Sequence, residues 1–406
     1  MPKLYIGYPA ALQKSLETIQ PLPHIELPIS ECVGCIAAED VFASVDSPSA
    51  ETSLKDGYAL RAEDIASFEG GRSKPLQVSG SVVAGQKDAG VLPRGTALRI
   101  LTGARLPDGA DTIVAEEFTQ LSDGAVFITA PTEKGRNILS RGSDTVAGSL
   151  LMKTGQQMTP GLIGLLATGG CETICVVRKP HVAIIATGDE ILLPGQPLPP
   201  GKLYASNLLT LNGWCRHFGF RTEMDIVGDD AEALRRRLAL TVEEQDAVVT
   251  SGGAWSGDKD MMARVLDDLG WEKLYHRVRL GPGKAVGFGT LNGKPVFILP
   301  GGPPSNLVAF LVLALPGLLK LCGHLAPGLP EIPAFLDEPV RGQKDWTQAI
   351  FGGLKKHSDG LHFVPYTNIQ SRLRRMAEAQ ALLLIPEGTS AFEAGAAVTV
   401  KLLEGP

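Results

Sequence analysis

Four glycine-rich loops are the features of this sequence best suited to chemistry. They are Thr187–Glu190, Ser251–Asp260, Gly281–Lys284 and Pro300–Asn306. Because glycine lacks a Cβ atom, backbone N–H groups in such loops can approach an anion closely, and the start of a following helix adds partial positive charge. One loop of this kind is typical of an ordinary turn or helix cap. Four of them in one region predict a site for a phosphate-bearing ligand.

The same region carries acidic side chains, which alone would repel a phosphate. They are Asp189, Glu190, Asp229, Asp230, Asp258 and Asp260. One interpretation is helix capping, for which Asp229 and Asp230 are well placed. The other is a magnesium site, because hard cations take carboxylate oxygens and bridge them to phosphate. Lys284 could add a positive point charge for the phosphate.

The segments around these loops alternate between strand-like and helix-like patterns. Strands are predicted from compact apolar runs at 181–186, 226–227, 247–250 and 296–299, and helices at 204–218, 231–240, 261–269 and from Pro303 through Leu318. Strands that are apolar throughout and separated by helices predict a mostly parallel sheet covered on both faces. Ligands of such sheets bind beyond the carboxyl ends of the strands, which is where the loops lie.

The rest of the chain reads mainly as β structure. Short apolar pieces between Gly, Pro and Asp turns predict a β domain at 51–141, and a second β region follows at 331–406. The first contains two short polar motifs, Asp56–Ala59 and Thr102–Ala104. Taken alone, both motifs read as turns.

Composition narrows the class of protein. The chain has 406 residues with a net charge of −6, and no clustered basic face of the kind that nucleic acid requires. Its longest apolar run, Leu307–Leu315, is shorter than the roughly 20 residues that span a bilayer, so it predicts a buried helix. No signal peptide is apparent at the N-terminus, and we expect a cytoplasmic protein that binds neither nucleic acid nor membrane.

Cys32 and Cys35 form a C-x-x-C pair, which could be half of a zinc site or two reduced thiols.

Taken together, the motifs resemble the molybdopterin molybdenumtransferases, the molybdenum insertase family. In chain order the matching pieces are Lys55–Ala59, Leu101–Ala104, Gly109–Thr112, Gly142 with Asp144, Thr187–Glu190, Ser251–Gly253, Gly257–Asp260, Pro282–Lys284 and Leu299–Gly301. They keep the family's order through nearly the whole chain. On these motifs the chain is identified as a member of that family.

The resemblance implies an elongated homodimer of four-part subunits. Residues 1–50 and 142–178 would form a dimerisation region, 51–141 an inserted β domain, 179–326 the α/β molybdopterin-binding domain with a mostly parallel sheet, and 331–406 a small β-barrel domain. The family enzyme binds adenylylated molybdopterin, cleaves its pyrophosphate with a divalent cation and inserts molybdate into the dithiolene. Its active site lies between the α/β domain of one subunit and the β domain of the other.

The resemblance also implies roles for individual residues. It implies that Glu190 and Asp260 are ligands of Mg²⁺. The residues with implied catalytic roles are Asp56, Thr102, Glu190, Asp230, Asp260 and Lys284. Substrate binding falls to Thr187, Gly188, Asp189, Ser251, Gly252, Gly253, Trp255, Ser256, Gly257, Pro282, Gly283, Pro300, Gly301, Gly302 and Pro303. Lys284 and the loop amides would hold the phosphates, while a cation held by the acids neutralises the charge that develops on the pyrophosphate.

Several positions depart from the family's pattern. Trp255 stands in place of a serine, Gly302 of an asparagine, Ala285 of a proline and Leu139 of an arginine, and Asp345–Gln348 replaces an arginine-rich strand. An indole cannot orient a water as a hydroxyl does, but it offers a flat stacking surface. Two hypotheses therefore stand: an insertase with a repacked pocket, or a paralogue that binds a pterin or another phosphorylated ligand without turnover. Molybdate and tungstate cannot be distinguished, because they share size and charge.

Overall fold

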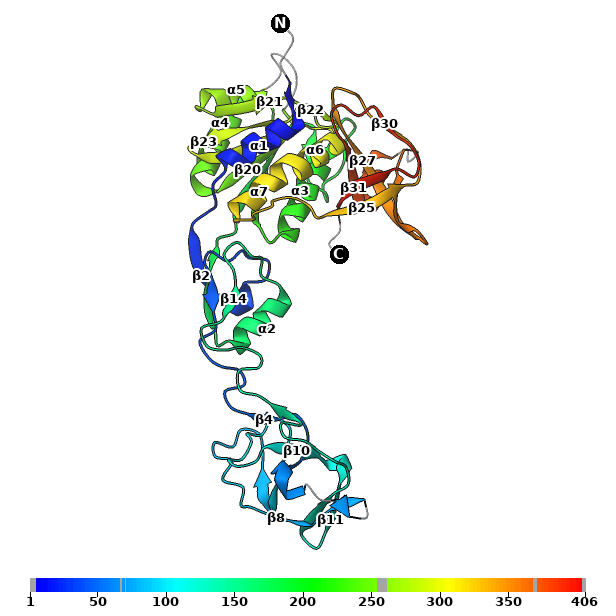
Figure 1. Cartoon of the computed structure of the whole chain (residues 1–406). Coiled ribbons are helices and arrows are strands. Elements are labelled where there is room, and N and C mark those ends of the chain that lie inside the picture. Colours follow the sequence, from blue (N-terminus) through cyan, green and yellow to red (C-terminus); the bar gives the residue numbers. More distant parts are fainter. Residues whose placement is uncertain (1–4, 66–67, 70, 254–260, 368–370, 404–406) are drawn as a thin grey trace.

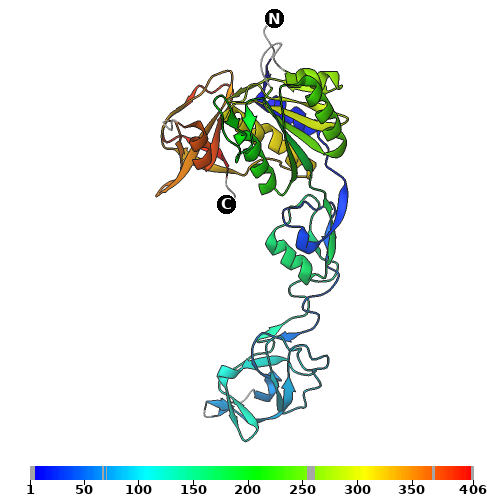
Figure 2. The ribbon, with the colours of Figure 1, turned by 180° about the vertical axis from the view of Figure 1, so that it is seen from behind.

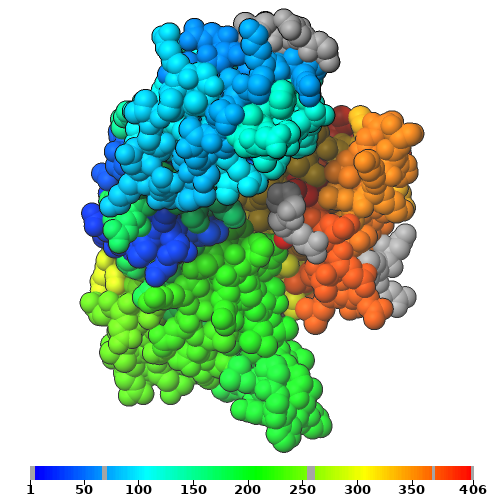
Figure 3. Space-filling view, turned by 90° about the horizontal axis from the view of Figure 1, so that it is seen from below, coloured from blue at the N-terminus to red at the C-terminus, as the bar shows by residue number. Residues whose placement is uncertain are grey.

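The computed structural model shows an elongated molecule in three tiers (Figures 1 and 2). It describes residues 5–65, 68–69, 71–253, 261–367 and 371–403. In Figure 1 the α/β domain and the C-terminal β region lie side by side at the top, a small middle region carries α2, and the β domain lies at the bottom. Figure 3, seen from below, shows the β domain in blue and cyan in front of the green α/β domain and the orange C-terminal region.

The α/β domain is built on one six-stranded sheet of order β19-β16-β20-β24-β23-β21. Its strands are β16 (His181–Thr187), β19 (Arg221–Val227), β20 (Ala247–Ser251), β21 (Glu272–His276), β23 (Gly287–Leu291) and β24 (Lys294–Leu299). The first four strands in the sheet order run parallel to one another, and β23 is antiparallel to both of its neighbours, β24 and β21. The predicted, mostly parallel sheet is therefore confirmed.

Helices cover both faces of this sheet. They are α3 (Ser206–His217), α4 (Ala231–Glu244), α5 (Met261–Asp268), α6 (Pro303–Ala309) and α7 (Leu315–Leu321). Alternate residues of β16 point into two cores: Val182 and Ile184 pack with α3, α6 and α7, and Ala183 and Ile185 pack with α4 and α5. This alternation follows from the period of two along a strand, and burial on both faces explains why the run is apolar throughout.

The helix at Pro303–Leu321 is continuous from α6 through a π-helical turn, Phe310–Ala314, to α7. It is long and apolar enough to cross a membrane by length and composition, but 83% of the apolar window is buried inside the protein. Its partners include Phe297 of the sheet and Ile19 near the N-terminus. This burial agrees with the interpretation of Leu307–Leu315 as a core helix.

The N-terminal residues pack on the α/β domain, and this differs from the assignment of residues 1–50 to one region with 142–178. Helix α1 (Tyr8–Thr18) contacts α7. Ser15 and Tyr275 of β21 share a buried hydrogen bond of 2.9 Å. The physical reason is that Ala11 and the residue after α1, Ile19, are buried in the α/β core, a contact that no local pattern reveals.

The middle region joins two separated stretches of chain. Strand β2 (His24–Pro28) pairs with β15 (Thr173–Val177), and β3 (Val41–Phe42) pairs with β14 (Leu150–Met152). Helix α2 (Pro160–Thr168) begins as predicted, with the hydroxyl of Thr159 accepting from the backbone N–H of Leu162.

All six cysteines are free thiols, and the C-x-x-C pair lies in the core of the middle region. Burial is the main cause that raises the pKa of Cys32 to about 11, so this thiol is protonated at neutral pH. Within the described ranges, no cysteine joins a cluster of three or more possible metal ligands. Burial in this core and the raised pKa of Cys32 agree with the interpretation of the pair as reduced thiols.

The β domain holds a six-stranded sheet of order β10-β5-β9-β8-β12-β11. The strands are β5 (Gly57–Leu60), β8 (Leu76–Val82), β9 (Thr96–Ile100), β10 (Thr112–Ala115), β11 (Thr119–Ser122) and β12 (Ala125–Ile128). A short ribbon of β4 (Thr52–Ser53) and β13 (Ile138–Leu139) lies at its junction with the middle region (Figure 1).

The C-terminal region is a closed barrel of five strands. They are β25 (Glu331–Leu336), β27 (Thr347–His357), β28 (Gly360–Pro365), β29 (Ala381–Ile385) and β31 (Ala397–Leu402). The ring closes because β27 pairs with both β28 and β29. The predicted small β-barrel is confirmed. Strand β22 (Val278–Gly281) links it to the α/β domain by pairing with β27 on one side and with β1 (Ile6–Gly7) on the other.

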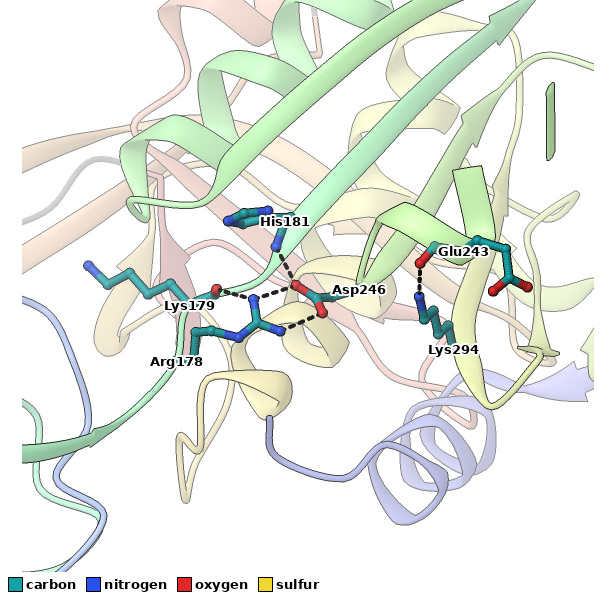
Figure 4. A network of polar contacts seen from close by, with 6 residues as sticks. All are labelled: Arg178, Lys179, His181, Glu243, Asp246 and Lys294. Carbon is teal, nitrogen blue, oxygen red and sulfur yellow. Dashed lines mark hydrogen bonds and ion pairs between the residues drawn. The ribbon is translucent and has the colours of Figure 1, made fainter. Parts of the chain in front are cut away.

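An ion pair fixes the point where the middle region enters the α/β domain (Figure 4). Two guanidinium nitrogens of Arg178 donate to the two carboxylate oxygens of Asp246 at 2.8 and 2.6 Å, and the backbone N–H of His181 adds a third bond at 2.8 Å. Burial raises the pKa of Asp246, but the hydrogen bonds from Arg178 and His181 and the charge of Arg178 outweigh it, so the pKa lies below its usual value.

We expect this pair to make stability depend on pH in a defined direction. Because the folded pKa of Asp246 is lowered, its contribution is fully present above the unfolded value of about 3.9 and is lost as the pH falls through the folded value. Asp246→Asn should lower the free energy of unfolding by about 2 kcal/mol at neutral pH. Urea unfolding should show this difference vanishing in acid, whereas a loss that is equal at both pH values would contradict the account. Exposed Asp268→Asn on α5 is the control.

Candidate functional site

The loops after four parallel strands meet at one edge of the α/β sheet and surround a cavity of about 840 Å³. The predicted residues that line it are Thr187, Gly188, Glu190, Ser251, Gly252, Gly253, Pro300, Gly301, Gly302 and Pro303. They come together because the strands β16, β19, β20 and β24 are neighbours and run the same way, so their carboxyl ends share an edge. The tertiary structure thus brings loops distant in sequence to one site.

Glycine is required where the first and second of these loops touch. Gly252 has a φ of +97°, and a Cβ atom there would lie 2.8 Å from the carbonyl oxygen of Thr187. Gly253 has a φ of +68°, and its Cβ would lie 3.1 Å from the Thr187 hydroxyl. Backbone, not side chain, therefore forms this wall of the cavity, as expected of a surface that a phosphate approaches closely.

Two asparagines tie the loops together. The buried Asn306 amide donates to Ser251 Oγ at 3.0 Å and to the Pro300 carbonyl at 2.9 Å. Asn207, in the first turn of α3, donates to Ser251 Oγ at 3.2 Å and to the Gly301 carbonyl at 2.7 Å. Ser251 therefore receives a bond from each, so the loops after β20 and β24 are held at a fixed separation.

Asn306→Ala is expected to loosen this edge of the sheet. The change removes the side-chain donor to the Pro300 carbonyl and one of the two amide donors to Ser251 Oγ, which costs about 1–3 kcal/mol of unfolding free energy. Denaturant unfolding of the α/β domain measures the loss. Gln13→Ala on α1 removes an exposed side chain–side chain bond to Glu17 and should change stability by no more than about 0.5 kcal/mol. Equal losses in the two variants would show that the loop contacts contribute nothing.

The acids of the region divide into two groups. Glu190 and Asp229 line the cavity with exposed side chains. Asp189 instead accepts from the backbone N–H of Asp229 at 3.0 Å. Asp230, predicted to be catalytic, is the N-cap of α4 and accepts from two backbone N–H groups of its first turn. Of the two interpretations of these acids, helix capping therefore applies to Asp230, whereas Asp229 lies at the cavity.

The loop at 281–284 was expected to join the other three, but none of its residues lines the cavity. Lys284 is exposed, and Gly283 lies close to Ser305, in the first turn of α6. The loop follows β22, which belongs to the sheet of the C-terminal barrel and not to that of the α/β domain. That topology places it beside the edge where the other loops meet. Catalytic and binding roles for Lys284, Pro282 and Gly283 remain predictions.

Four predicted residues, Trp255, Ser256, Gly257 and Asp260, lie outside the described residues. Of the two predicted Mg²⁺ ligands, Glu190 and Asp260, only Glu190 is among the residues that the structure describes. The side chains at the cavity that the sequence did not predict include Arg264 of α5 and Asn207 of α3. Both lie near the start of a predicted helix that follows a glycine-rich or strand-end loop, and that position was the available signal.

Asp56 and Thr102 form a second small site at the other end of the molecule. The backbone N–H and the hydroxyl of Thr102 donate to Asp56 Oδ1 at 2.6 and 2.7 Å. These bonds lower the pKa of Asp56, so it is ionised at neutral pH. Both residues belong to the β domain, which lies at the opposite end of the molecule from the α/β domain (Figure 1). The structure brings the two predicted residues to each other but not to Glu190 within one chain.

A mostly parallel sheet with a glycine-lined cavity, combined with a β domain and a terminal barrel, defines a multidomain protein built around an α/β ligand-binding domain. Three family models match the sequence: "MoeA N-terminal region (domain I and II)" at residues 6–170, "Probable molybdopterin binding domain" at 183–320 and "MoeA C-terminal region (domain IV)" at 334–403. The chain belongs to the MoeA family, and the resemblance drawn from its motifs is confirmed.

Known relatives agree along the whole chain. A molybdopterin molybdenumtransferase of Staphylococcus epidermidis is 30% identical over 401 residues, covering 98% of this chain and 96% of the relative. One from Staphylococcus aureus is 29% identical over 400 residues, covering 97% and 94%. The crystal structure of a molybdopterin biosynthesis MoeA protein from Pyrococcus horikoshii has a TM-score of 0.81 and 32% identity, covering 99% of this chain and all of that one.

Proposed function

We propose that this protein inserts molybdate into adenylylated molybdopterin and cleaves the adenylate in a magnesium-dependent step. The observation that carries the proposal is the 840 Å³ cavity, which combines glycine-rich strand ends with the acids Glu190 and Asp229 in the molybdopterin-binding domain. Sites for ligands of this size commonly enclose about 300–1,000 Å³. The cavity is therefore large enough for a pterin with its phosphates.

The polar groups of the cavity suit a phosphorylated ligand. Arg264 supplies a guanidinium, which matches the oxygens of a phosphate. The first turn of α3 contributes Ser206 and Asn207, so the positive end of that helix faces the same space. Fixed donors of this kind orient the substrate without reorganising during the reaction, and such orientation supplies much of the rate in phosphoryl chemistry.

The cavity residues fit a hard divalent cation. Glu190 and Asp229 present carboxylate oxygens, the donors that Mg²⁺ takes together with substrate phosphates, and both side chains are exposed to the cavity. These two acids would hold the ion, joined by Asp260 as the resemblance implies. Mg²⁺ bound there supplies neutralisation of the charge that develops when the pyrophosphate is cleaved.

A second copy of the chain supplies the remaining residues in this proposal. Asp56 is ionised and exposed, yet it belongs to the β domain, which lies at the opposite end of the subunit from the α/β domain that carries Glu190 (Figure 1). In a two-fold dimer the same patch of each subunit meets the other, so the β domain of one subunit can reach the α/β domain of its partner. The homodimer thus explains why two small polar sites lie at opposite ends of one chain.

A direct assay tests the function. The purified full chain, given adenylylated molybdopterin, molybdate and Mg²⁺, is expected to release AMP and form molybdenum cofactor, and removal of the divalent ion by chelation should reduce AMP release at least about 100-fold. Gly213→Ala on α3, where an added methyl meets open space, controls for handling and should keep full activity. Tight binding of the pterin with no AMP release by folded protein would favour the paralogue without turnover.

That second candidate rests on one specific observation in the cavity. Gly302 lines it and contributes no side chain, where the family motif that this sequence resembles has an asparagine.

We place the reaction in the cytoplasm, because all six thiols are free, as in a reducing compartment. Parallel assays with molybdate and tungstate would establish which oxyanion is inserted.

A further inference from the structure

A cluster of two histidines and an aspartate lies on the C-terminal barrel, apart from the cavity and from Asp56. His357 ends β27, His362 lies in β28, and Asp337 follows β25. Lys355 is the partner of His362 across the hairpin, so His357, two residues further along, points to the same face. Phe335 is the partner of His362 on the other side, so Asp337, two residues beyond it, also shares that face. Strand pairing therefore places all three side chains together.

The possible ligand atoms converge. Oδ1 of Asp337 lies 3.2 Å from Nδ1 of His362 and 4.0 Å from Nε2 of His357. The three atoms all lie within 4.8 Å of one another. Ligands about 2.0–2.2 Å from a tetrahedral ion are separated by somewhat over 3 Å, so small side-chain rotations would close the set around one ion.

The other nitrogen of His362 has its own acceptor. Nε2 lies 3.1 Å from Oδ1 of Asp359, so this imidazole stands between two carboxylates. A neutral ring carries one N–H and one lone pair, and the lone pair would then face a carboxylate oxygen. A metal ion between Nδ1 and Asp337 removes that repulsion. The ring of His357 is stacked on that of His362 with centroids 4.2 Å apart, and its possible ligand atom belongs to the same group of three.

We propose that Asp337, His357 and His362 bind a divalent transition-metal ion of the zinc type. Two imidazoles and one carboxylate are a donor set for borderline ions, whereas Mg²⁺ and Ca²⁺ take mostly oxygen. Asp359 would hold the proton of His362 on Nε2 and so direct Nδ1 at the metal, the usual arrangement of a carboxylate behind a ligating histidine. The bound ion ties the end of the β27–β28 hairpin to the end of β25, which is a role separate from the proposed insertase site.

Zinc titration of the chelator-treated full chain tests the site. Calorimetry in excess Mg²⁺, which occupies the oxygen sites of the cavity, is expected to show one zinc ion bound per chain with micromolar or tighter affinity. His357→Gln and His362→Gln should each weaken that binding at least about tenfold. His24→Gln, a change at an exposed histidine of β2, should leave it unchanged. His357 is 43% exposed, so its variant is not expected to disturb folding, which circular dichroism verifies.

Deuterium exchange locates the ion independently of affinity. Zinc should slow amide exchange at residues 355–362 in the wild-type chain and should leave it unchanged in His357→Gln. Absence of a zinc site would overturn the proposal. Zinc binding that persists at full strength in both histidine variants, or that slows exchange only around the cysteines of the middle region, would overturn it equally.

Discussion

Gly57→Ala is expected to unfold the β domain while leaving the α/β domain intact. Gly57 begins β5 and is the partner of Ala115 in β10. An added Cβ would overlap the carbonyl oxygen of Val114 and lie 2.9 Å from the Cα of Ala115. Because both obstacles are backbone atoms, no side-chain rotation relieves them. The two strands must move apart, and we expect a loss of about 3 kcal/mol or more, at the upper end of overpacking effects.

The measurement is thermal unfolding followed by limited proteolysis. Early cleavage within residues 51–141, with the α/β transition unchanged, is the expected result, because separate cores serve the two domains. Gly161→Ala in α2 is the matched control, since an added methyl there meets open space and alanine favours helix by up to about 1 kcal/mol. A Gly57→Ala protein as stable as Gly161→Ala would mean that β5 and β10 are not packed as described.

Paired variants of the two polar sites are expected to reveal a shared active site between subunits. Asp56→Asn and Glu190→Gln remove one charge each with little change of shape. As homodimers, both should lose activity at least about 100-fold, the size expected when a charge next to the reacting group is removed. A heterodimer with one variant on each chain keeps one site with both acids intact. It should recover about half of the wild-type activity, because one of the two sites of a two-fold dimer is complete.

The matched control places both changes on one chain and pairs it with a wild-type chain. If each site takes Glu190 from one subunit and Asp56 from the other, both sites of this heterodimer are defective and activity stays near that of the homodimeric variants. If each site were formed within one chain, the two results would be reversed, because the wild-type chain would keep a complete site. The pair of heterodimers therefore decides the arrangement whatever the absolute rate.

The sequence by itself determined the α/β domain and most of its cavity. The strands that end at Thr187, Ser251 and Leu299 carry their own signal, an apolar run followed within two residues by glycine. Neighbouring parallel strands then place these carboxyl ends on one edge of the sheet. The ordered motifs also identified the family, and the family resemblance implied the small C-terminal β-barrel. The closure of that barrel with five strands came from the structure.

Tertiary structure alone decided the contacts between distant segments. It joined Asp56 to Thr102, packed α1 on α7 and turned Asn207 and Arg264 toward the cavity. It also separated Asp229 from Asp230, giving one to the cavity and the other to a helix cap, and gathered Asp337, His357 and His362 on one face of the barrel. The physical reason is common to all of these. Local patterns record the period and the ends of an element, whereas the direction of one side chain depends on strand register and on the neighbour that packs against it.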